Sequence, residues 1–169
     1  ASKPVVLFVD TFNGYFESEN AWAACEVLSA AGYQVHVASR TQHDTPGEHL
    51  CCGRTYLASG QVSKAKEHAQ ALLEALLPFA QKGIAIVGLE PSCLLTLRDE
   101  SLVMGLGDMA ETVAVSAVLF EEFLAAENKA GQLAALKAKL ASAQKPILVH
   151  GHCHQKAFGL MPSVTQVIQ

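Results

Sequence analysis

Pro4-Val-Val-Leu-Phe-Val9 is a continuous apolar run with three β-branched residues, and a polar turn at residues 10–14 follows it directly. A short apolar run of this kind predicts a strand that is buried on both faces. Residues 17–31 carry apolar side chains at helical spacing and end at Gly32, which predicts a helix with a glycine stop. Residues 33–38 alternate between apolar and polar side chains and predict a second strand. The three elements form a βαβ unit, whose two strands are expected to run parallel.

The rest of the chain continues this alternation after a polar loop at residues 40–50. The further elements are predicted as helices at residues 59–82, 109–126 and 132–143, and as strands at residues 84–87 and 146–149. Pro91, which follows the third strand, suits the first turn of another helix. This order predicts an α/β fold, a Rossmann-like parallel sheet of about four strands with helices on both faces. No linker rich in Pro, Gly or Ser divides the chain, so residues 1–169 are expected to form a single α/β domain.

The composition narrows the class of protein. Of the 169 residues, 50% are hydrophobic and 17% are charged, with a formal net charge of −4, which supports a buried core and excludes a disordered chain. Lys and Arg are scattered rather than gathered in a basic stripe, so we expect no nucleic-acid partner. No apolar run reaches the roughly 18 residues of a membrane span, and the N-terminus does not resemble a signal peptide. We therefore expect a cytoplasmic protein without a transmembrane segment, which could lie peripherally at the inner membrane surface.

The chain has five cysteines, which are Cys25, Cys51, Cys52, Cys93 and Cys153. An odd number of cysteines without an export signal argues against a disulfide framework. In a reducing compartment, clustered cysteines more often bind a metal or take part in redox chemistry, whereas a lone buried cysteine is often a small hydrophobe. We assign the packing role to Cys25 and treat the other four as candidate ligands.

Most of the unusual polar residues follow a predicted strand. Asp10 and Thr11 follow the first strand, Cys51–Cys52 follow the second after a loop, Cys93 follows the third and Cys153 the fourth. In an open parallel sheet, binding sites form beyond the carboxyl ends of the strands, on the loops that come next. If the four strands are parallel, we expect these side chains to converge on one edge of the sheet.

The tripeptide Cys51-Cys52-Gly53 is the most informative motif. Adjacent thiols on one loop can bind one metal ion or bridge two iron atoms, and Gly53 lets the backbone turn sharply behind them. Thiolates are the preferred ligands of iron–sulfur clusters and also bind zinc well. Two other interpretations remain: an incidental pair of cysteines, and vicinal redox chemistry, which the strained ring of a disulfide between neighbours disfavours.

The other two cysteines lie in different settings. Cys93 falls at the start of a predicted helix, where the helix dipole lowers a thiol pKa and suits a ligand or a nucleophile, although packing is an alternative role. His150-Gly-His-Cys-His154 gathers three imidazoles and a thiol, a donor set that suits zinc, iron or copper. We expect Cys153, with His152 and His154, to be ligand candidates, and we favour capping or hydrogen bonding for His150. A Cys153–His nucleophile in a small independent enzyme is a further interpretation.

At these residues the chain resembles the cysteine-rich CCG domain family, found in heterodisulfide reductase subunits and in the iron–sulfur subunits of glycolate-oxidising enzymes. It is most similar to the C-terminal region of FAD-linked oxidases of the D-lactate and D-2-hydroxyglutarate dehydrogenase type. The stretches that carry the resemblance extend over almost the whole chain and are residues 10–17, 51–54, 88–100 and 150–157.

The resemblance implies two CCG motifs in tandem, each with a lone Cys, then Cys-Cys-Gly, and then Cys-x-x-Cys. Cys51–Cys52 and Cys93 match the first motif, and Thr96 stands at its last cysteine. Cys153 matches the lone cysteine of a second motif. The chain is therefore expected to be a fragment of a larger protein, with the first CCG half and the start of the second.

The resemblance further implies an iron–sulfur or metal-binding electron-transfer region of an FAD-dependent 2-hydroxyacid dehydrogenase. Electrons would pass from FAD, held by an FAD-oxidase domain of the same protein or complex, to a quinone or another acceptor. No residue of this chain is expected to be catalytic. Because some ligand positions depart from the family pattern, a zinc-binding structural or docking module is the alternative. The residues expected to hold a cofactor or metal are Cys51, Cys52, Cys93, Cys153, His152 and His154.

Overall fold

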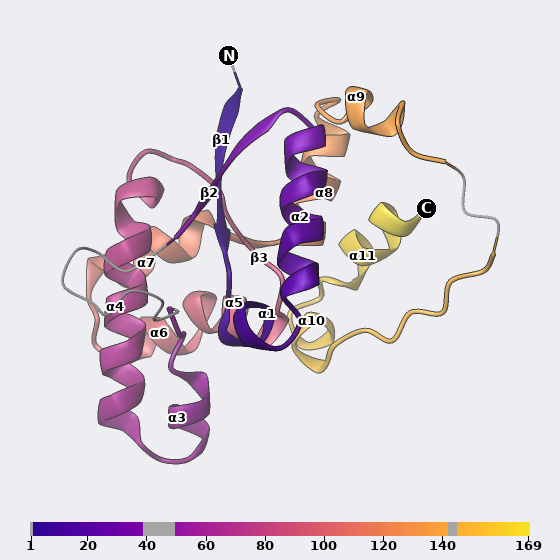
Figure 1. The fold of residues 1–169 in the computed structure, drawn as a ribbon. Helices are drawn as coiled ribbons and strands as arrows, with labels where there is room; N and C mark the ends of the chain where they lie inside the picture. Colours follow the sequence, from indigo (N-terminus) through magenta and orange to yellow (C-terminus); the bar gives the residue numbers. More distant parts are fainter. Residues whose placement is uncertain (1, 39–49, 142–144) are drawn as a thin grey trace.

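The computed structural model describes residues 2–38, 50–141 and 145–169, and its centre is a sheet of four parallel strands (Figure 1). The strands lie in the order β2-β1-β3-β4, and their bounds are Lys3–Phe8 for β1, Tyr33–Val37 for β2, Ile86–Gly88 for β3 and Ala117–Leu119 for β4. β1 is therefore a central strand, paired with β2 on one side and with β3 on the other. The predicted α/β fold with about four parallel strands is confirmed.

The central place of β1 follows from its unbroken apolar sequence. Val5, Val6 and Leu7 are completely buried, and Phe8 is almost so. Neighbouring side chains of a strand point to opposite faces, so Val6 and Phe8 pack in one hydrophobic cluster while Val5 and Leu7 pack in another. A charged side chain in this run would face one of the two clusters and oppose burial of the strand.

Helices cover both faces of the sheet, as predicted. Apolar side chains of α4 (Val62–Ala80), α5 (Pro91–Arg98) and α7 (Asp108–Ser116) pack in the cluster that contains Val6 and Phe8. Those of α2 (Ser18–Ala30) and α8 (Phe120–Lys129) pack in the other cluster. Figure 1 shows α4 and α7 on one side of the strands, with α2 and α8 on the other. In the described part of the chain, no helix combines the length and the apolar character that a bilayer span requires.

Short helices gather near the carboxyl ends of the strands (Figure 1). They are α1 (Thr11–Tyr15), α3 (Arg54–Ala58), α6 (Glu100–Val103) and α10 (Cys153–Ala157). Two more complete the fold: α9 (Ala134–Lys137), whose Leu136 packs in the cluster beneath α2, and α11 (Met161–Ile168), which contacts α8.

The predicted fourth strand at residues 146–149 is wrong, because the place beside β3 is taken by β4. Val87 of β3 pairs with Val118 of β4. Val118 lies within residues 109–126, whose apolar spacing predicts a continuous helix. Residues 146–149 instead run outside the sheet without regular structure, and Leu148 is 99% exposed. A strand needs a neighbour for its backbone hydrogen bonds, and no strand in the described residues lies beside this segment.

This exposed segment nevertheless repeats the start of the chain. Lys145-Pro-Ile-Leu-Val149 corresponds to Lys3-Pro-Val-Val-Leu7, and each precedes, at the same spacing, a capping residue and a five-residue helix. The capping residues are Asp10 for α1 and His152 for α10. The two segments therefore share their local sequence signals, and they differ in whether neighbouring strands are present.

Two long predicted helices differ from those observed. The helix predicted at residues 59–82 is α4, which begins later because Gly60 has a φ of +77° and separates it from α3. The helix predicted at residues 109–126 is divided by β4 into α7 and α8. Glu122 accepts a hydrogen bond from the backbone N–H of Leu119 at 2.9 Å, which begins α8 as a new helix.

The remaining predicted segments are only partly described. Of the helix predicted at residues 132–143, α9 forms in the described part, and residues 142–144 lie outside the described residues. The predicted polar loop at residues 40–50 also lies outside them except for Leu50, which is buried.

Leu76→Ala should lower the free energy of unfolding by about 2–5 kcal/mol, because it leaves a cavity in a fully buried site. Leu148→Ala makes the same change at an exposed site and should alter stability by less than about 0.5 kcal/mol. Urea denaturation followed by circular dichroism measures both values. Equal losses in the two variants would show that residues 146–149 are buried in the folded protein.

Candidate functional site

Asp10 lies two residues after the end of β1 and organises the carboxyl edge of the sheet. Its Oδ1 accepts hydrogen bonds from the backbone N–H groups of Phe12 at 2.9 Å and Asn13 at 3.1 Å, which caps α1. Its Oδ2 accepts a third hydrogen bond, from Nδ2 of Asn13 at 2.6 Å. These bonds compensate for the burial of the carboxylate. Thr11 is thereby held where its hydroxyl contacts the thiol of Cys51.

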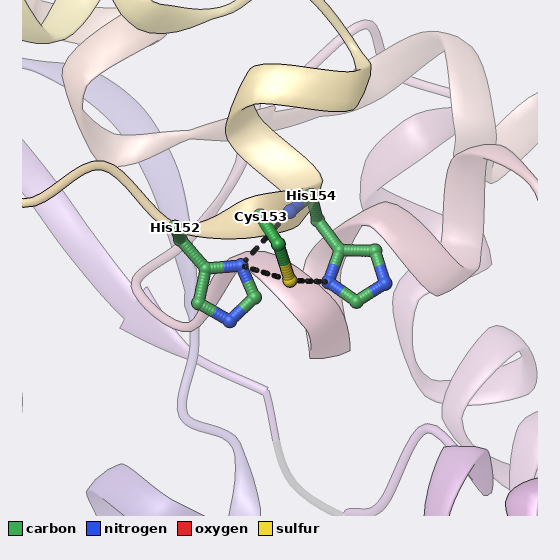
Figure 2. Close-up of side chains that lie close together, drawn as sticks. All are labelled: His152, Cys153 and His154. Carbon is green, nitrogen blue, oxygen red and sulfur yellow. Dashed lines mark hydrogen bonds between the residues drawn. The ribbon is translucent and has the colours of Figure 1, made fainter.

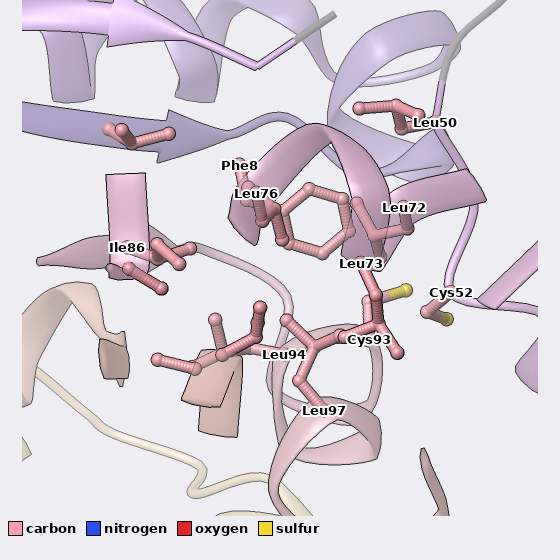
Figure 3. Close-up of a cluster of buried hydrophobic side chains, with 14 of the residues drawn as sticks. Phe8, Leu50, Cys52, Leu72, Leu73, Leu76, Ile86, Cys93, Leu94 and Leu97 are labelled. Carbon is pink, nitrogen blue, oxygen red and sulfur yellow. The ribbon is translucent and has the colours of Figure 1, made fainter. Parts of the chain in front are cut away.

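Three cysteine thiols meet at this edge. The thiol of Cys52 interacts with the thiol of Cys51 and with that of Cys93 on α5, but the three sulfur atoms are not a group of ligand atoms that all lie within 4.8 Å of one another. Cys52 and Cys93 are 3% and 6% exposed, whereas Cys51 is half-buried. Figure 3 shows the sulfur atoms of Cys52 and Cys93 next to each other at the border of the apolar cluster, near Leu73. The structure thus brings together thiols from two separate motifs.

The surroundings of these thiols favour their neutral form. The hydrogen bond to Cys52, together with burial, raises the pKa of Cys51 far above its usual value. For Cys52, the bond to Cys51 lowers the pKa, but the contact with Cys93 and burial outweigh it and raise the pKa to about 12. For Cys93, the bond to Cys52 lowers the pKa. Burial and the charges of Glu90 and Asp10 together outweigh this bond, so the pKa is raised overall. Negative charge beside the thiols disfavours their thiolate form but favours a bound cation. A metal ion bound there would lower the pKa values of the thiols instead.

Glu90 caps α5 and positions Cys93. Its Oε2 accepts hydrogen bonds from the backbone N–H of Cys93 and from the hydroxyl of Ser92, both at 2.6 Å. Burial alone would raise the pKa of Glu90, but these hydrogen bonds lower it overall. An ionised carboxylate is therefore fixed beside the Cys93 thiol. Pro91 lies in the first turn of α5, where its sequence position predicts it.

Thr96 occupies the place at which the CCG pattern has its last cysteine. It is completely buried, and its hydroxyl donates a hydrogen bond to the backbone oxygen of Ser92 at 2.8 Å. A hydroxyl is a poorer ligand than a thiolate for iron or zinc. The edge therefore offers three thiols and the nearby carboxylates of Asp10 and Glu90 as donors.

Gly53 allows the cysteine loop to pack closely against α4. Its φ of +82° lies in the left-handed region, and a Cβ atom built on it would stand 2.3 Å from the backbone oxygen of Ala65. The backbone N–H of Gly53 also donates to Sγ of Cys51 at 3.4 Å. Glycine is therefore required here both for its conformation and for its lack of a side chain.

Arg54 joins the cysteine loop to the histidine motif. Its guanidinium forms an ion pair with Glu100 of α6, and its Nη2 lies 2.8 Å from Nε2 of His154. Arginine can only donate, so Nε2 accepts, and the proton of a neutral His154 is assigned to Nδ1. Arg54 is not among the site residues predicted from the sequence. Its position directly after Gly53 is the signal that could have identified it.

His152, Cys153 and His154 form a second group of donors, at the start of α10 (Figure 2). Sγ of Cys153 lies 3.9 Å from Nδ1 of His152 and 3.6 Å from Nδ1 of His154, and the two rings stack with their centroids 5.1 Å apart. The three ligand atoms all lie within 4.8 Å of one another. Among the residues that the structure describes, no other group of three His, Cys, Asp or Glu side chains meets this spacing.

Hydrogen bonds already engage both imidazoles of this group. Nδ1 of His152 accepts from the backbone N–H of His154 at 3.2 Å, and its Nε2 lies 3.7 Å from Oε1 of Glu90. A metal ion at Nδ1 of His154 would require the other tautomer, which Arg54 opposes by donating to Nε2. Cys153 is exposed and is the most accessible donor of the three.

The histidine motif reaches the edge of the sheet without a strand before it. Gln155 accepts from the backbone N–H of His152 at 3.0 Å and donates to Glu121 of α8. Gly151 is buried, and a Cβ atom there would stand 2.3 Å from Sδ of Met161 on α11. Contacts with α8 and α11 therefore position the motif. Sequence reasoning assigned that role to the strand predicted at residues 146–149.

Two further candidate residues, His150 and Cys25, belong to neither group of donors. His150 is exposed and is not one of the residues of the donor group on α10. Cys25 lies on α2, packs at the margin of the cluster beneath that helix, and has a pKa that burial raises. Its surroundings agree with a packing role.

No protein-family model, curated protein or solved structure matches this chain. The resemblance to the CCG domain family therefore stays a prediction from the residues that carry it.

Gly53→Ala should destabilise the protein strongly, because the added methyl group meets the backbone of Ala65 in addition to the left-handed strain of about 1–3 kcal/mol. Gly60→Ala is the matched control, since Gly60 has a similar φ of +77° but nothing within 4 Å of an added Cβ. It should show the strain alone. Chemical denaturation measures both variants, and equal losses of stability would contradict the close approach of Gly53 to α4.

Proposed function

We propose that this chain is the iron–sulfur or metal-binding electron-transfer region of an FAD-dependent 2-hydroxyacid dehydrogenase of the D-lactate, glycolate or D-2-hydroxyglutarate type. The observation that carries the proposal is the contact of the Cys52 thiol with the thiols of both Cys51 and Cys93. The resemblance of these motifs to the CCG domain family supports the electron-transfer role.

The donor set fits a centre with thiolate ligands. The thiol of Cys52, between those of Cys51 and Cys93, links two loops, and the carboxylates of Asp10 and Glu90 add negative charge beside them. Iron–sulfur clusters are held mainly by cysteine thiolates. A centre with four protein ligands needs one further donor, which a neighbouring carboxylate or another part of a larger protein can supply.

The residues of this chain hold the thiols and set the charge around them. Asp10 and Glu90 are fixed by their capping bonds to α1 and α5, and Cys93 is placed by the second of these caps. Cys52 and Cys93 belong to the hydrophobic cluster around Leu72, which keeps water away from one side of the site. Burial, charge and hydrogen bonds to sulfur set the reduction potential of a bound cluster. When bound, the cluster supplies one-electron transfer.

The proposal assigns the other parts of the reaction to other parts of the parent protein. FAD and the hydroxyacid would be held by an FAD-oxidase domain of the same protein or complex, and electrons would leave to a quinone or another acceptor. The location that this role implies is cytoplasmic, or peripheral at the inner membrane surface.

After anaerobic reconstitution with ferrous iron and sulfide, the chain should contain iron and acid-labile sulfide and should absorb visible light. Cys52→Ser should reduce iron binding most, because Cys52 contacts both of the other thiols. Cys51→Ser and Cys93→Ser should each lower metal affinity by more than about tenfold. Iron and sulfide assays, together with visible absorption, measure these changes.

Cys25→Ser is the matched control, because it removes a thiol that lies on α2 and outside the site. It should leave the iron content unchanged. Iron and sulfide contents that survive all three substitutions at Cys51, Cys52 and Cys93 would refute the proposed centre.

A second candidate function is a zinc-binding structural or docking module without a redox role of its own. It is favoured by the mixed nitrogen and sulfur donors of His152, Cys153 and His154, whose ligand atoms lie within 4.8 Å of one another.

If zinc binds at this second group, Cys153→Ser should abolish stoichiometric zinc binding, since it removes the one thiol of the group. Cys93→Ser, the same change at the other group of donors, should leave zinc binding intact. Atomic absorption of protein dialysed against zinc measures the content. Loss of zinc in Cys93→Ser but not in Cys153→Ser would place the ion at the thiols of Cys51, Cys52 and Cys93 instead.

A further inference from the structure

A small apolar pocket opens beside α2, and Cys25 is the one cysteine among its lining residues. Its volume is about 230 Å³, and its walls come from the carboxyl ends of β1 and β2, from α1 and from α2. Val9 and Val37 form one side, and Ala21 and Trp22 form another. The volume is below the roughly 300–1,000 Å³ of a typical small-molecule site, so it suits a single large side chain better than a cofactor.

The pocket offers little for a polar ligand. Of its polar lining residues, Asn13 is buried and donates its side-chain amide to Asp10 at 2.6 Å. The other polar lining residue that is not a cysteine is Ser18, at the exposed start of α2. An apolar occupant therefore matches the lining, and its burial would be favourable at about 25 cal/mol per Å² of apolar surface.

Aromatic side chains extend this apolar surface beyond the pocket. Trp22 is 71% exposed at its wall, and Phe16 is 75% exposed on the turn between α1 and α2. Phe12 is 48% exposed, and its ring contacts that of Phe16 with centroids 6.4 Å apart. Exposed aromatic residues gathered around a pocket are typical of surfaces that bind another protein.

Among the described residues of α1, α2 and the turn between them, every charged side chain is acidic. Residues 4–38 contain no Lys or Arg, while Glu17, Glu19 and Glu26 are exposed on or beside α2. A second copy of the chain would bring the same acidic residues together, and an anionic lipid surface would be repelled. Complementary charge therefore requires a partner with basic residues around its apolar anchor.

We propose that the pocket and the aromatic surface of α1 and α2 form a docking site for a partner protein. The partner inserts one bulky apolar side chain next to Trp22 and places Lys or Arg side chains against Glu17 and Glu19. A basic amphipathic helix has this chemistry, because its apolar and basic side chains can flank one another at helical spacing. The proposal goes beyond the electron-transfer role and does not depend on a bound metal.

Trp22 is the only tryptophan in the chain, so its fluorescence reports directly on this site. The probes are two synthetic helical peptides without tryptophan that share a leucine face, one with lysines on its polar face and the other with glutamates. The lysine peptide should shift Trp22 emission to the blue and bind at least about tenfold more tightly than the glutamate peptide, with a loss of affinity at high salt. Equal affinities, or no binding of the lysine peptide, would overturn the proposal.

Two variants separate this site from general attraction to an acidic protein. Ala21→Leu fills the pocket and should weaken binding of the lysine peptide by about tenfold or more, as the loss of one anchor in an interface does. Glu19→Lys should weaken it in low salt, whereas Glu67→Lys on α4, across the sheet, should have little effect. Circular dichroism confirms that each variant is folded. Unchanged binding in Glu19→Lys, or an equal loss in Glu67→Lys, would refute the docking site even if Ala21→Leu fails to fold.

Discussion

The burial of β1 between two parallel neighbours is the constraint on which the rest of the structure depends. Because β1 is paired with β2 and β3 and covered on both faces, its carboxyl end has a fixed position. Asp10 begins α1 at this end, and β3, which runs in the same direction, brings Glu90 and Cys93 to the same edge. The thiols come together because the strands are parallel, although Cys52 and Cys93 are far apart in the sequence.

The candidate site and the hydrophobic core share side chains. Cys52 and Cys93 belong to the cluster that also holds Phe8 and Leu72, so the sulfur atoms stand where the core meets the carboxyl edge (Figure 3). Burial is one reason why their thiols stay protonated, together with the nearby carboxylates. A metal ion that binds the folded but not the unfolded chain would displace those protons and would also stabilise the fold. Metal content and conformational stability are thus linked through the same residues.

The sequence predicts well those elements whose local signals agree with their surroundings. The apolar run of β1, the stop at Gly32 and the proline of α5 all lie where patterns indicate them, and the loop after β2 and the start of α5 carry the thiols that meet. It fails at β4, because Ala117–Leu119 reads as part of a helix and becomes a strand through pairing with β3. It also fails at residues 146–149, which have strand-like sequence but no neighbour among the described strands. Sheet partners, and long-range contacts such as Arg54 with His154, are not encoded in local periodicity.

The exposed segment between α9 and α10 has a practical consequence for the two groups of donors. Residues 145–150 are solvent-accessible and lack regular structure, and backbone of this kind is readily cleaved by proteases. A single cut there would leave α10 and α11 attached through their packing against α5 and α8 and through Arg54. The thiols of Cys51, Cys52 and Cys93 and the His152–His154 group would then be on different polypeptides, held together only by these noncovalent contacts.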